Sequence, residues 1–494
     1  MNKKKQLVFV PAPGIGHLAS MVEVAKNIIN RYGDHLSITV LILKPPFHSS
    51  NLLDSYIHSL STSITSIHFL PLSPPSSSPI SSLDKVSIET FISVFVETNK
   101  TLIKDTITNL IMINPKSDES TNPVQLVGLV VDLFYTAVID VGNELGVPTY
   151  LYFTSSAAFL GLMLHLPILH TQITTEFKDS DIELKIPSFV NSVPPSVLPQ
   201  PLLNKKDDGY TWFVHHGRRF RETKGIMVNT FSDLEPYPLD SFLLDGQIPP
   251  VYPVGPLIDL KGQTQLQPDQ TQYNTIMKWL DDQPPSSVIL LCFGSMGSFD
   301  EQQVTEIAVG LERSGHRFLW SLREPAKTNL AIAGEYTNLE EVLPHGFLER
   351  TKGIGLVCGW VPQVSVLGHQ AIGGFVSHCG WNSILESLWF GVPIVTWPLY
   401  AEQQVNAFEM VKELGLAVEL RLDYRKGSSD NDLVVANEIE RGVKYVMDMS
   451  GGNEVRKKVK KMREKSRKAV MDKDGSSYAC LARLIESLID GISK

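Results

Sequence analysis

The sequence predicts an α/β protein with two doubly wound parallel sheets, and three observations support this prediction. Short apolar runs alternate with amphipathic segments along most of the chain, which is the pattern of βαβ units. The order of strand, glycine-containing loop and helix opens the chain and begins again at Val288. At 494 residues the chain is too long for one ordinary core and suits two domains of about 200–250 residues each.

The expected strands are short apolar runs bounded by polar residues or glycines. In the first half they are Gln6–Val10, Ser37–Leu43, Ser66–Leu70, Val127–Val131, Thr149–Phe153 and Gly225–Asn229. In the second half they are Val288–Phe293, Phe318–Ser321, Gly355–Gly359, Gly373–Ser377 and Pro393–Trp397, with a helix over Asp300–Ser314.

The expected domain boundaries lie where the apolar periodicity stops. The stretch Asp259–Tyr273 is rich in Gln, Thr, Asp, Gly and Pro and has no apolar period, as is typical of a linker. We therefore expect an N-terminal domain over residues 1–258, a linker over 259–274 and a C-terminal domain over 275–475. The tail places its leucines and isoleucines on one helical face, so we expect a helix over 476–494 that packs back across the domains.

Charge and cysteine content exclude several classes of protein. The net charge of −9, without a long basic run, argues against a nucleic-acid partner. The four cysteines form no C-x-x-C pair, which excludes a zinc ribbon or a disulfide framework and favours a reducing compartment. The apolar run Leu7–Val10 is too short for a signal peptide, and Leu151–Leu169 carries too many polar residues for a membrane span. We expect a cytoplasmic monomer with no transmembrane segment.

One strand–turn–helix unit of the second half has the features of an anion-binding site. The expected strand Gly373–Ser377 is followed by a turn that begins at His378 and by an apolar-faced helix. The free N–H groups of that helix's first turn attract phosphate through hydrogen bonds and the helix dipole. His378, Asn382 and Ser383 add side-chain donors, and Glu386 lies one turn further along. A lone histidine here would be a core residue, but the cluster favours a ligand site.

Two polar residues follow expected strands of the first half. His17 comes directly after Gly14-Ile15-Gly16, at the carboxyl end of the first strand, and Asp132 ends the run Leu126–Val131. Active-site residues of open α/β sheets collect at this edge. An aspartate beside a histidine can hold the imidazole in one tautomer and stabilise its protonated form. Taken singly, each residue could equally have a structural role.

The segment from Trp360 to Gln403 resembles the signature box of plant secondary-metabolite UDP-glycosyltransferases. The matching residues are Trp360-Val361-Pro362-Gln363, His378-Cys379-Gly380-Trp381-Asn382-Ser383, Glu386 and Glu402-Gln403. The loops Pro11–Gly16 and Phe293–Ser295 also resemble that family, and the likeness extends over essentially the whole chain. The resemblance implies a GT-B fold, with two Rossmann-like domains, a cleft between them, and the donor held by the C-terminal half.

Residue by residue, the resemblance also implies a donor site for a UDP-sugar. The implied contacts are Trp360, Val361 and Gln363 to uracil, Glu386 to ribose, His378, Asn382, Ser383 and Ser295 to the diphosphate, and Trp381, Glu402 and Gln403 to the sugar. Many members carry Asp where this chain has Glu402, so sugar contacts should shift slightly. Gln403 is associated with glucose, which makes UDP-glucose the implied co-substrate, with no cofactor and no metal.

For the chemistry, the resemblance implies His17 as general base, Asp132 as its partner, and inversion at the anomeric carbon. The implied acceptor is a small lipophilic hydroxyl compound such as a flavonoid, another phenolic, a lignan or a triterpenoid. Ile15, Phe134 and Ala401 are the expected acceptor contacts.

Three alternatives remain open at this point. Gly14–Ala19 fits the dinucleotide fingerprint G-x-G-x-x-[GA], but the second expected strand ends in Lys44 and not in the acidic residue that a Rossmann dehydrogenase needs. Asp179-Ser180-Asp181 and Asp430-Asn431-Asp432 match a metal-binding D-x-D pattern, and we interpret both as solvated loop acids. A non-catalytic UDP-sugar-binding protein of the same fold is the third, although such a protein would need neither His17 nor Asp132.

Overall fold

The computed structural model describes residues 5–45, 50–74, 86–112, 125–179, 182–260, 270–326, 333–426, 433–448 and 454–490. Most of the expected linker, residues 261–269, lies outside these ranges. The D-x-D sequence at 430–432 also lies outside them, as do the last two residues of the one at 179–181.

The first sheet is parallel throughout and has the strand order β3-β2-β1-β4-β5-β6-β7. Its strands are β1 (Lys5–Val10), β2 (Leu36–Leu43), β3 (Ile67–Leu72), β4 (Gln125–Asp132), β5 (Thr149–Phe153), β6 (Gly225–Val228) and β7 (Val251–Pro253). The order changes direction between β1 and β4, and ligands of doubly wound sheets bind outside the carboxyl ends at such a point.

The second sheet is also parallel, with the order β10-β9-β8-β11-β12-β13. Its strands are β8 (Val288–Cys292), β9 (Arg317–Ser321), β10 (Gly355–Cys358), β11 (Ile372–Ser377), β12 (Ile394–Thr396) and β13 (Ala417–Glu419). Its direction changes between β8 and β11. The prediction of two doubly wound sheets is confirmed, and among the described strands the short edge strands β7 and β13 were not expected.

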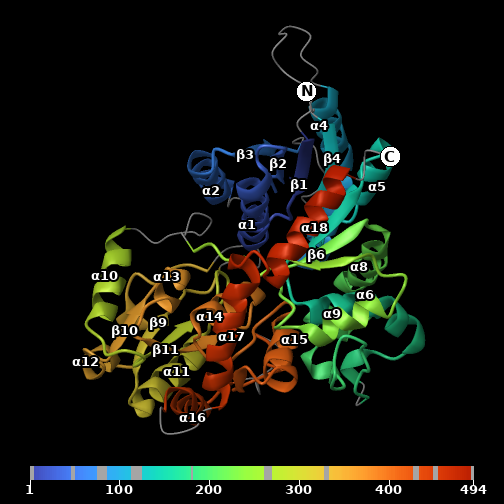
Figure 1. Cartoon of the computed structure of the whole chain (residues 1–494). Helices are drawn as coiled ribbons and strands as arrows, with labels where there is room; N and C mark the ends of the chain where they lie inside the picture. Colours follow the sequence, from blue (N-terminus) through green and yellow to red (C-terminus); the bar gives the residue numbers. More distant parts are fainter. Residues whose placement is uncertain are drawn as a thin grey trace.

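Helices connect the strands and pack on both faces of the sheets (Figure 1). In the first half they are α1 (Ile15–Tyr32), α2 (Ser50–Ser63), α3 (Ile88–Thr98), α4 (Lys100–Met112), α5 (Val138–Leu145), α6 (Ala157–Gln172), α7 (Gln200–Leu203), α8 (Asp208–Arg219) and α9 (Pro236–Leu243). In the second half they are α10 (Gln270–Asp281), α11 (Glu301–Ser314), α12 (Phe347–Arg350), α13 (Gln363–Leu367), α14 (Trp381–Phe390), α15 (Gln403–Phe408), α16 (Ala436–Met447), α17 (Glu454–Met471) and α18 (Ser476–Asp490). Among the described helices, none combines the length and the apolar character needed to cross a bilayer.

Strand β1 shows why these runs are strands that are buried on both faces. Leu7 and Phe9 belong to the core cluster formed with α1, α2 and α18, whereas Val8 and Val10 belong to the cluster on the opposite face. Successive side chains of a strand point to opposite faces, so a strand between two helical layers must be apolar at every position. This explains the unbroken apolar run in the sequence.

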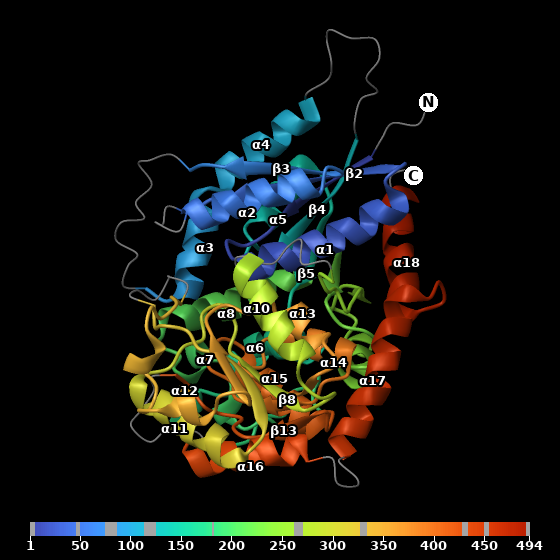
Figure 2. The ribbon, with the colours of Figure 1, turned by 90° about the vertical axis from the view of Figure 1, so that its left-hand side faces the viewer.

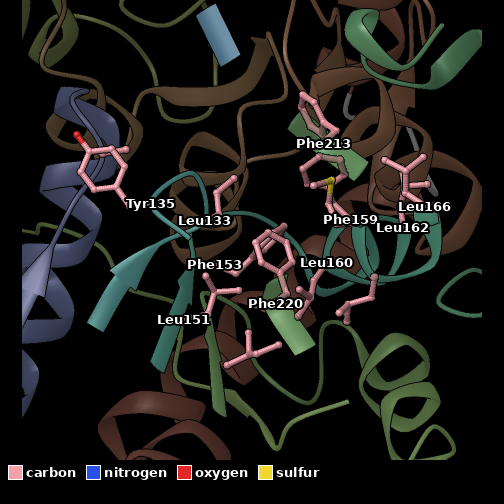
Figure 3. Packing of buried hydrophobic residues seen from close by; sticks show 14 of the residues in the cluster. Leu133, Tyr135, Leu151, Phe153, Phe159, Leu160, Leu162, Leu166, Phe213 and Phe220 are labelled. Carbon is pink, nitrogen blue, oxygen red and sulfur yellow. The ribbon is translucent and has the colours of Figure 1, made fainter. Parts of the chain in front are cut away.

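The core on the second face of the first sheet is rich in aromatic side chains (Figure 3). Phe153 of β5 lies with its ring centroid 5.7 Å from that of Phe159 on α6 and 5.9 Å from that of Phe220. Full burial of each such ring contributes about 1.5–3 kcal/mol. The carboxyl end of β5 is therefore a rigid platform, and the loop that leaves it carries residues of the site described below.

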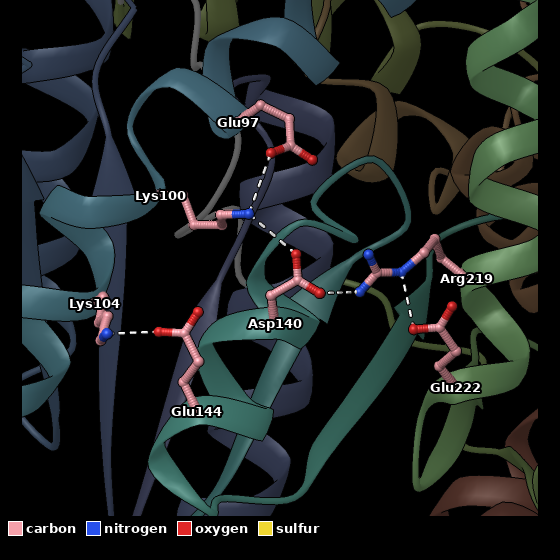
Figure 4. A network of polar contacts seen from close by, with 7 residues as sticks. All are labelled: Glu97, Lys100, Lys104, Asp140, Glu144, Arg219 and Glu222. Carbon is pink, nitrogen blue, oxygen red and sulfur yellow. Dashed lines mark hydrogen bonds and ion pairs between the residues drawn. The ribbon is translucent and has the colours of Figure 1, made fainter.

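A chain of charged side chains joins α4, α5 and α8 at the surface (Figure 4). Asp140 accepts hydrogen bonds from Lys100 Nζ at 3.0 Å and from Arg219 at 2.6 Å. Burial alone would raise the pKa of Asp140, but the hydrogen bonds from Arg219 and Lys100 outweigh that effect and lower it. Such part-exposed pairs are each worth at most about 1 kcal/mol, so the chain mainly fixes the register of the three helices.

The last helix returns to the first sheet. Figures 1 and 2 show α17 beside the second half and α18 beside α1 and β4 of the first. Leu481, Leu484 and Leu488 belong to the same core cluster as Leu7. A Cβ at Gly128 of β4 would lie 3.2 Å from Leu7 Cδ2 and 3.4 Å from Leu488 Cδ2, so glycine lets this helix approach the strand.

Candidate functional site

His17 and Asp132 meet at the carboxyl edge of the first sheet. His17 lies in the first turn of α1, directly after β1, and Asp132 is the last residue of β4. Because β1 and β4 are neighbouring parallel strands, with Val10 opposite Val131, both residues reach the same edge. His17 Nδ1 lies 2.8 Å from Asp132 Oδ2. The expected pair therefore forms.

The carboxylate of Asp132 is buried and held at both oxygens. Its side chain is 0% exposed, and its second oxygen accepts a hydrogen bond from the backbone N–H of Phe134 at 3.1 Å. The His17 side chain is 30% exposed. Because Nδ1 faces Asp132, Nε2 is the ring nitrogen left for a substrate.

The surroundings of His17 favour its protonated form. Burial lowers the pKa of His17, but the charge and hydrogen bond of Asp132 outweigh burial, and Glu402 of the second half adds to them, so that the pKa is raised overall. A base whose pKa is raised towards neutrality accepts a proton more readily in a transition state. The Glu402 contribution also indicates that the two halves meet beside His17.

Of the three expected acceptor contacts, Phe134 and Ile15 lie near His17 at this edge, whereas Ala401 lies in the second half. The Phe134 ring centroid is 5.9 Å from the His17 ring, and the part-buried Ile15 begins α1 two residues before His17. Ala401 is exposed and lies next to Glu402 in the second half, with a φ of 56° that non-glycine residues seldom adopt.

The first turn of α14 is the expected anion site. The helix begins at Trp381 after Gly380, and no side chain caps its N–H groups. Asn382 and Ser383 lie in this turn, and α14 leaves β11 at the point where the second sheet changes direction. The free N–H groups therefore remain as donors to a phosphate group.

His378 lies between two glycines. A Cβ at Gly294 would be 2.7 Å from His378 Nε2, and one at Gly380 would be 2.5 Å from it, so neither position accommodates a side chain. Burial lowers the pKa of His378 to about 4, which keeps the ring neutral. A hydrogen bond with the Cys292 backbone opposes this lowering of the pKa.

Ser295 is exposed and follows Gly294 in the loop after β8. Since β8 and β11 are neighbours, this loop and the turn at His378 lie at one edge of the sheet.

The expected uracil contacts follow β10. Trp360 packs against Arg323, whose guanidinium carbon lies 4.7 Å from the Trp360 ring centroid. The backbone N–H of Trp360 donates to Glu335 Oε1 at 2.8 Å, and the neighbouring Val361 is buried. Gln363 begins α13. Arg323 thus covers one face of Trp360 and Glu335 holds its backbone, and neither residue was among the expected site residues.

Gln363 links two other predicted ligand contacts. Its Nε2 donates to Ser383 Oγ at 2.9 Å and to Glu386 Oε2 at 2.7 Å. Burial raises the pKa of Glu386 to about 7, and the Gln363 hydrogen bond opposes this rise. The resemblance implied separate contacts for these three side chains, whereas in the structure they form one hydrogen-bonded group.

The expected sugar contacts lie where the two halves meet. Glu402 Oε1 accepts a hydrogen bond from Ser155 Oγ at 3.1 Å, and Ser155 belongs to the loop after β5. Gln403 uses its Oε1 to accept from the backbone N–H groups of Leu399 and Tyr400 at 2.9 and 3.0 Å. This fixes the turn, and the Gln403 side chain also hydrogen-bonds the Tyr400 phenol, which opposes the rise that burial causes in the pKa of Tyr400.

Asn229 directly follows β6 and was not among the site residues expected from the sequence. Its carbonyl accepts from Trp381 Nε1 at 2.7 Å, its Oδ1 accepts from the Leu257 N–H at 2.9 Å, and its Nδ2 lies 3.5 Å from Asn382 Oδ1. Asn229 is the last residue of an expected strand, so the strand-end rule that found Asp132 would have found it as well.

In the part of the chain that the structure describes, no group of three or more His, Cys, Asp or Glu side chains is arranged to hold a metal ion.

Residues 243–448 match the family described as "UDP-glucoronosyl and UDP-glucosyl transferase". Over 489 residues the chain is 50% identical to UDP-glycosyltransferase 71K1 of Malus domestica, covering 99% of each. Over 500 residues it is 50% identical to a putative UDP-glucose flavonoid 3-O-glucosyltransferase 3 of Fragaria ananassa, covering 99% of this chain and 100% of the relative.

Two solved structures are similar over nearly the whole length. The crystal structure of Medicago truncatula UGT71G1 complexed with UDP-glucose superposes with a TM-score of 0.85 at 48% identity, covering 98% of each chain. Phytolacca americana UGT2, complexed with UDP-2fluoro-glucose and pterostilbene, superposes with a TM-score of 0.82 at 34% identity, covering 98% of this chain and 100% of that one.

Proposed function

Because this chain belongs to the plant UDP-glycosyltransferase family, we propose that it transfers glucose from UDP-glucose to a hydroxyl group of a small lipophilic acceptor. Its two parallel sheets form the GT-B fold of that family, and the chain is a UDP-dependent glycosyltransferase. Family membership overturns the alternative of a Rossmann dehydrogenase, whose fingerprint matched only at Gly14–Ala19.

The donor is proposed to bind along the carboxyl edge of the second sheet. Uracil would stack on the face of Trp360 opposite Arg323, beside Val361 and Gln363, and the ribose hydroxyls would meet Glu386. The diphosphate would accept hydrogen bonds from the first turn of α14, from His378 and from Ser295. Support comes from the uncapped helix start and from the close approach of His378 Nε2 to Gly294 and Gly380.

Transfer is proposed to be a single in-line displacement. Nε2 of His17 takes the proton of the acceptor hydroxyl as the oxygen attacks the anomeric carbon, and the bond from that carbon to the diphosphate oxygen breaks. The configuration at the carbon inverts, because no covalent intermediate forms. Asp132 stabilises the imidazolium, and the α14 N-terminus receives the charge that develops on UDP.

No metal is needed in this proposal, since the helix N-terminus and neutral donors meet the diphosphate. The cytoplasmic location and the monomeric state also remain proposals. A flavonoid or another phenolic is the acceptor class we favour, because one relative is named a flavonoid glucosyltransferase and Phe134 lies beside His17.

The observation that carries the proposal is the contact between His17 and Asp132, placed where the donor half supplies Glu402. The test is to incubate the purified chain with UDP-glucose and a panel of flavonoids, other phenolics, lignans and triterpenoids. We expect release of UDP together with a product that is heavier by one hexosyl group, and inverted product configuration by NMR. UDP-glucose binding without any transfer would favour the alternative, a non-catalytic UDP-sugar-binding protein.

A further inference from the structure

A hydrogen bond between the two halves reaches one of the proposed sugar contacts. Ser155 lies two residues after β5 in the first half, and Glu402 lies directly before α15 in the second. The Ser155 hydroxyl donates to Glu402 Oε1 at 3.1 Å. Ser155 is only 3% exposed, so water competes little for its hydroxyl.

Among the described residues, this bond is the better of two that hold the Glu402 carboxylate. Asn406 Nδ2 lies 3.4 Å from the same Oε1 but also donates to the Cys379 carbonyl at 3.0 Å, so its contact with Glu402 is the weaker. Both contacts are made to Oε1. Oε2 is thus the oxygen left to accept hydrogen bonds from sugar hydroxyls.

The length of the Glu402 side chain gives a partner from the other half a role in fixing it. A glutamate has one more rotatable bond than an aspartate, and fixing it costs additional conformational entropy. The backbone that precedes it is already constrained, since Ala401 has a φ of 56°. A partner from the opposite half is therefore the group that selects one rotamer of Glu402 when the halves are together.

We propose that Ser155 is a positioning residue for the donor sugar, because its hydroxyl orients the Glu402 carboxylate and so couples the meeting of the two halves to sugar recognition. The proposal rests on the proposed function, in which Glu402 faces the sugar. Ser155 itself need not touch the substrate. The pairing is specific to the long side chain, because an aspartate at position 402 would withdraw its carboxylate from Ser155.

The test compares Ser155→Ala with wild type, using UDP-glucose as donor and UDP as the ligand that lacks a sugar. We expect kcat/KM for UDP-glucose to fall by about tenfold or more, the size of a lost hydrogen bond to a charged group. The inhibition constant of UDP and the KM of the acceptor should stay within about twofold of wild type, as a residue acting only on the sugar end requires.

Two comparisons check that Ser155 acts through Glu402, and a third variant is the structural control. In a Glu402→Asp background, Ser155→Ala should change kcat/KM by less than about twofold, because the two effects are then not additive. Ser155→Cys keeps a side chain of similar size that is a weaker hydrogen-bond donor. Its kcat/KM for UDP-glucose should lie between the values of Ser155→Ala and wild type. Ser156→Ala is the structural control, since Ser156 Oγ caps α6 by accepting from the Phe159 N–H. It should lower the melting temperature without changing the ratio of UDP-glucose to UDP affinity.

An unchanged kcat/KM in Ser155→Ala would overturn the inference. An equally large fall in kcat/KM when Ser155→Ala is made in the Glu402→Asp background would also overturn it. Parallel losses in UDP inhibition and acceptor KM would make Ser155 merely structural and would also overturn it. If wild type transfers no glucose, the proposed function fails. The inference is then decided by calorimetry, where Ser155→Ala should weaken UDP-glucose binding but not UDP binding.

Discussion

The indole Nε1–H of Trp381 donates a hydrogen bond to the backbone carbonyl of Asn229 at 2.7 Å, which joins the start of α14 to the end of β6. Trp381 is 2% exposed and Asn229 is fully buried. The helix start that we assign to the diphosphate is therefore fastened to the first half by a bond that water does not reach.

We expect Trp381→Phe to destabilise the protein by about 1–3 kcal/mol, because the Asn229 carbonyl would remain buried without a donor. Chemical denaturation measures the change in the free energy of unfolding. Trp279→Phe, at a part-exposed position on α10, is the matched control and should cost less. Equal losses in the two variants would show that ring volume matters and that the hydrogen bond does not.

His17→Ala should abolish transfer while UDP still binds, since no described contact of the expected nucleotide site involves His17. Turnover is measured by product mass spectrometry and UDP affinity by calorimetry. Retention of the wild-type kcat would remove His17 from the mechanism. A loss of UDP binding would indicate instead that the variant is misfolded.

The rate should rise with pH as His17 loses its proton, because only the neutral imidazole can act as base. The midpoint of this rise in kcat/KM should lie above 6.5, since the pKa of His17 is raised by Asp132 and Glu402 against the effect of burial. Asp132→Ala removes the larger of these two influences. It should move the midpoint to lower pH and reduce kcat by a few orders of magnitude, by analogy with catalytic triads. An unshifted midpoint would show that Asp132 does not raise the pKa of His17.

Glu235 and Glu409 form a buried pair of acids across the halves. Glu235 precedes α9 and is fully buried, and Glu409 begins the π-helical turn Glu409–Glu413 and is 1% exposed. Glu235 Oε1 accepts from the Ala158 N–H at 2.7 Å. Burial raises the pKa of both carboxyl groups, and the two side chains are close enough to hydrogen-bond each other.

The pair should make stability fall as pH rises. Above the ordinary value of 4.5 the folded pair holds protons that the unfolded glutamates release, so deprotonation favours unfolding. Glu409→Gln supplies an N–H donor and removes one charge. It should raise the melting temperature, and more at pH 8 than at pH 5, by the equivalent of about 1–3 kcal/mol. Glu340→Gln, at an exposed position, is the control and should leave the melting temperature unchanged at both pH values. A lower melting temperature for Glu409→Gln at pH 8 would contradict the conclusion that deprotonation of this pair destabilises the fold.

Transfer should be unaffected by EDTA, because the proposed donor site meets the diphosphate with helix N–H groups and neutral side chains. Initial rates with and without chelator, after dialysis, measure this. If activity is lost in EDTA and restored by Mg²⁺, a metal takes part. The D-x-D sequences would then be candidate metal ligands again.

Local patterns predicted the strands because each is a continuous apolar run, and the carboxyl-end rule correctly placed His17 and Asp132 at one edge. The same patterns could not show that Gln363 bonds Ser383 and Glu386, since neither partner is a helical neighbour of Gln363. Ser155 and Glu402 lie in different halves, 247 positions apart in the sequence, and their contact depends on how the two sheets face each other. No local signal encodes that arrangement. The domain boundaries and the roles of the site residues stay predictions.

The position of α18 on β4 has a consequence for synthesis of the protein. The first sheet is complete in sequence once β7 has left the ribosome, yet the part of its apolar surface that α18 covers, beside Gly128, stays exposed until Leu488 emerges. Until then, the nascent chain exposes a patch that invites aggregation or chaperone binding. The half that is translated first is therefore the last to be finished, and stop codons that remove only the final turns should trap a nearly full-length chain in an incompletely folded state.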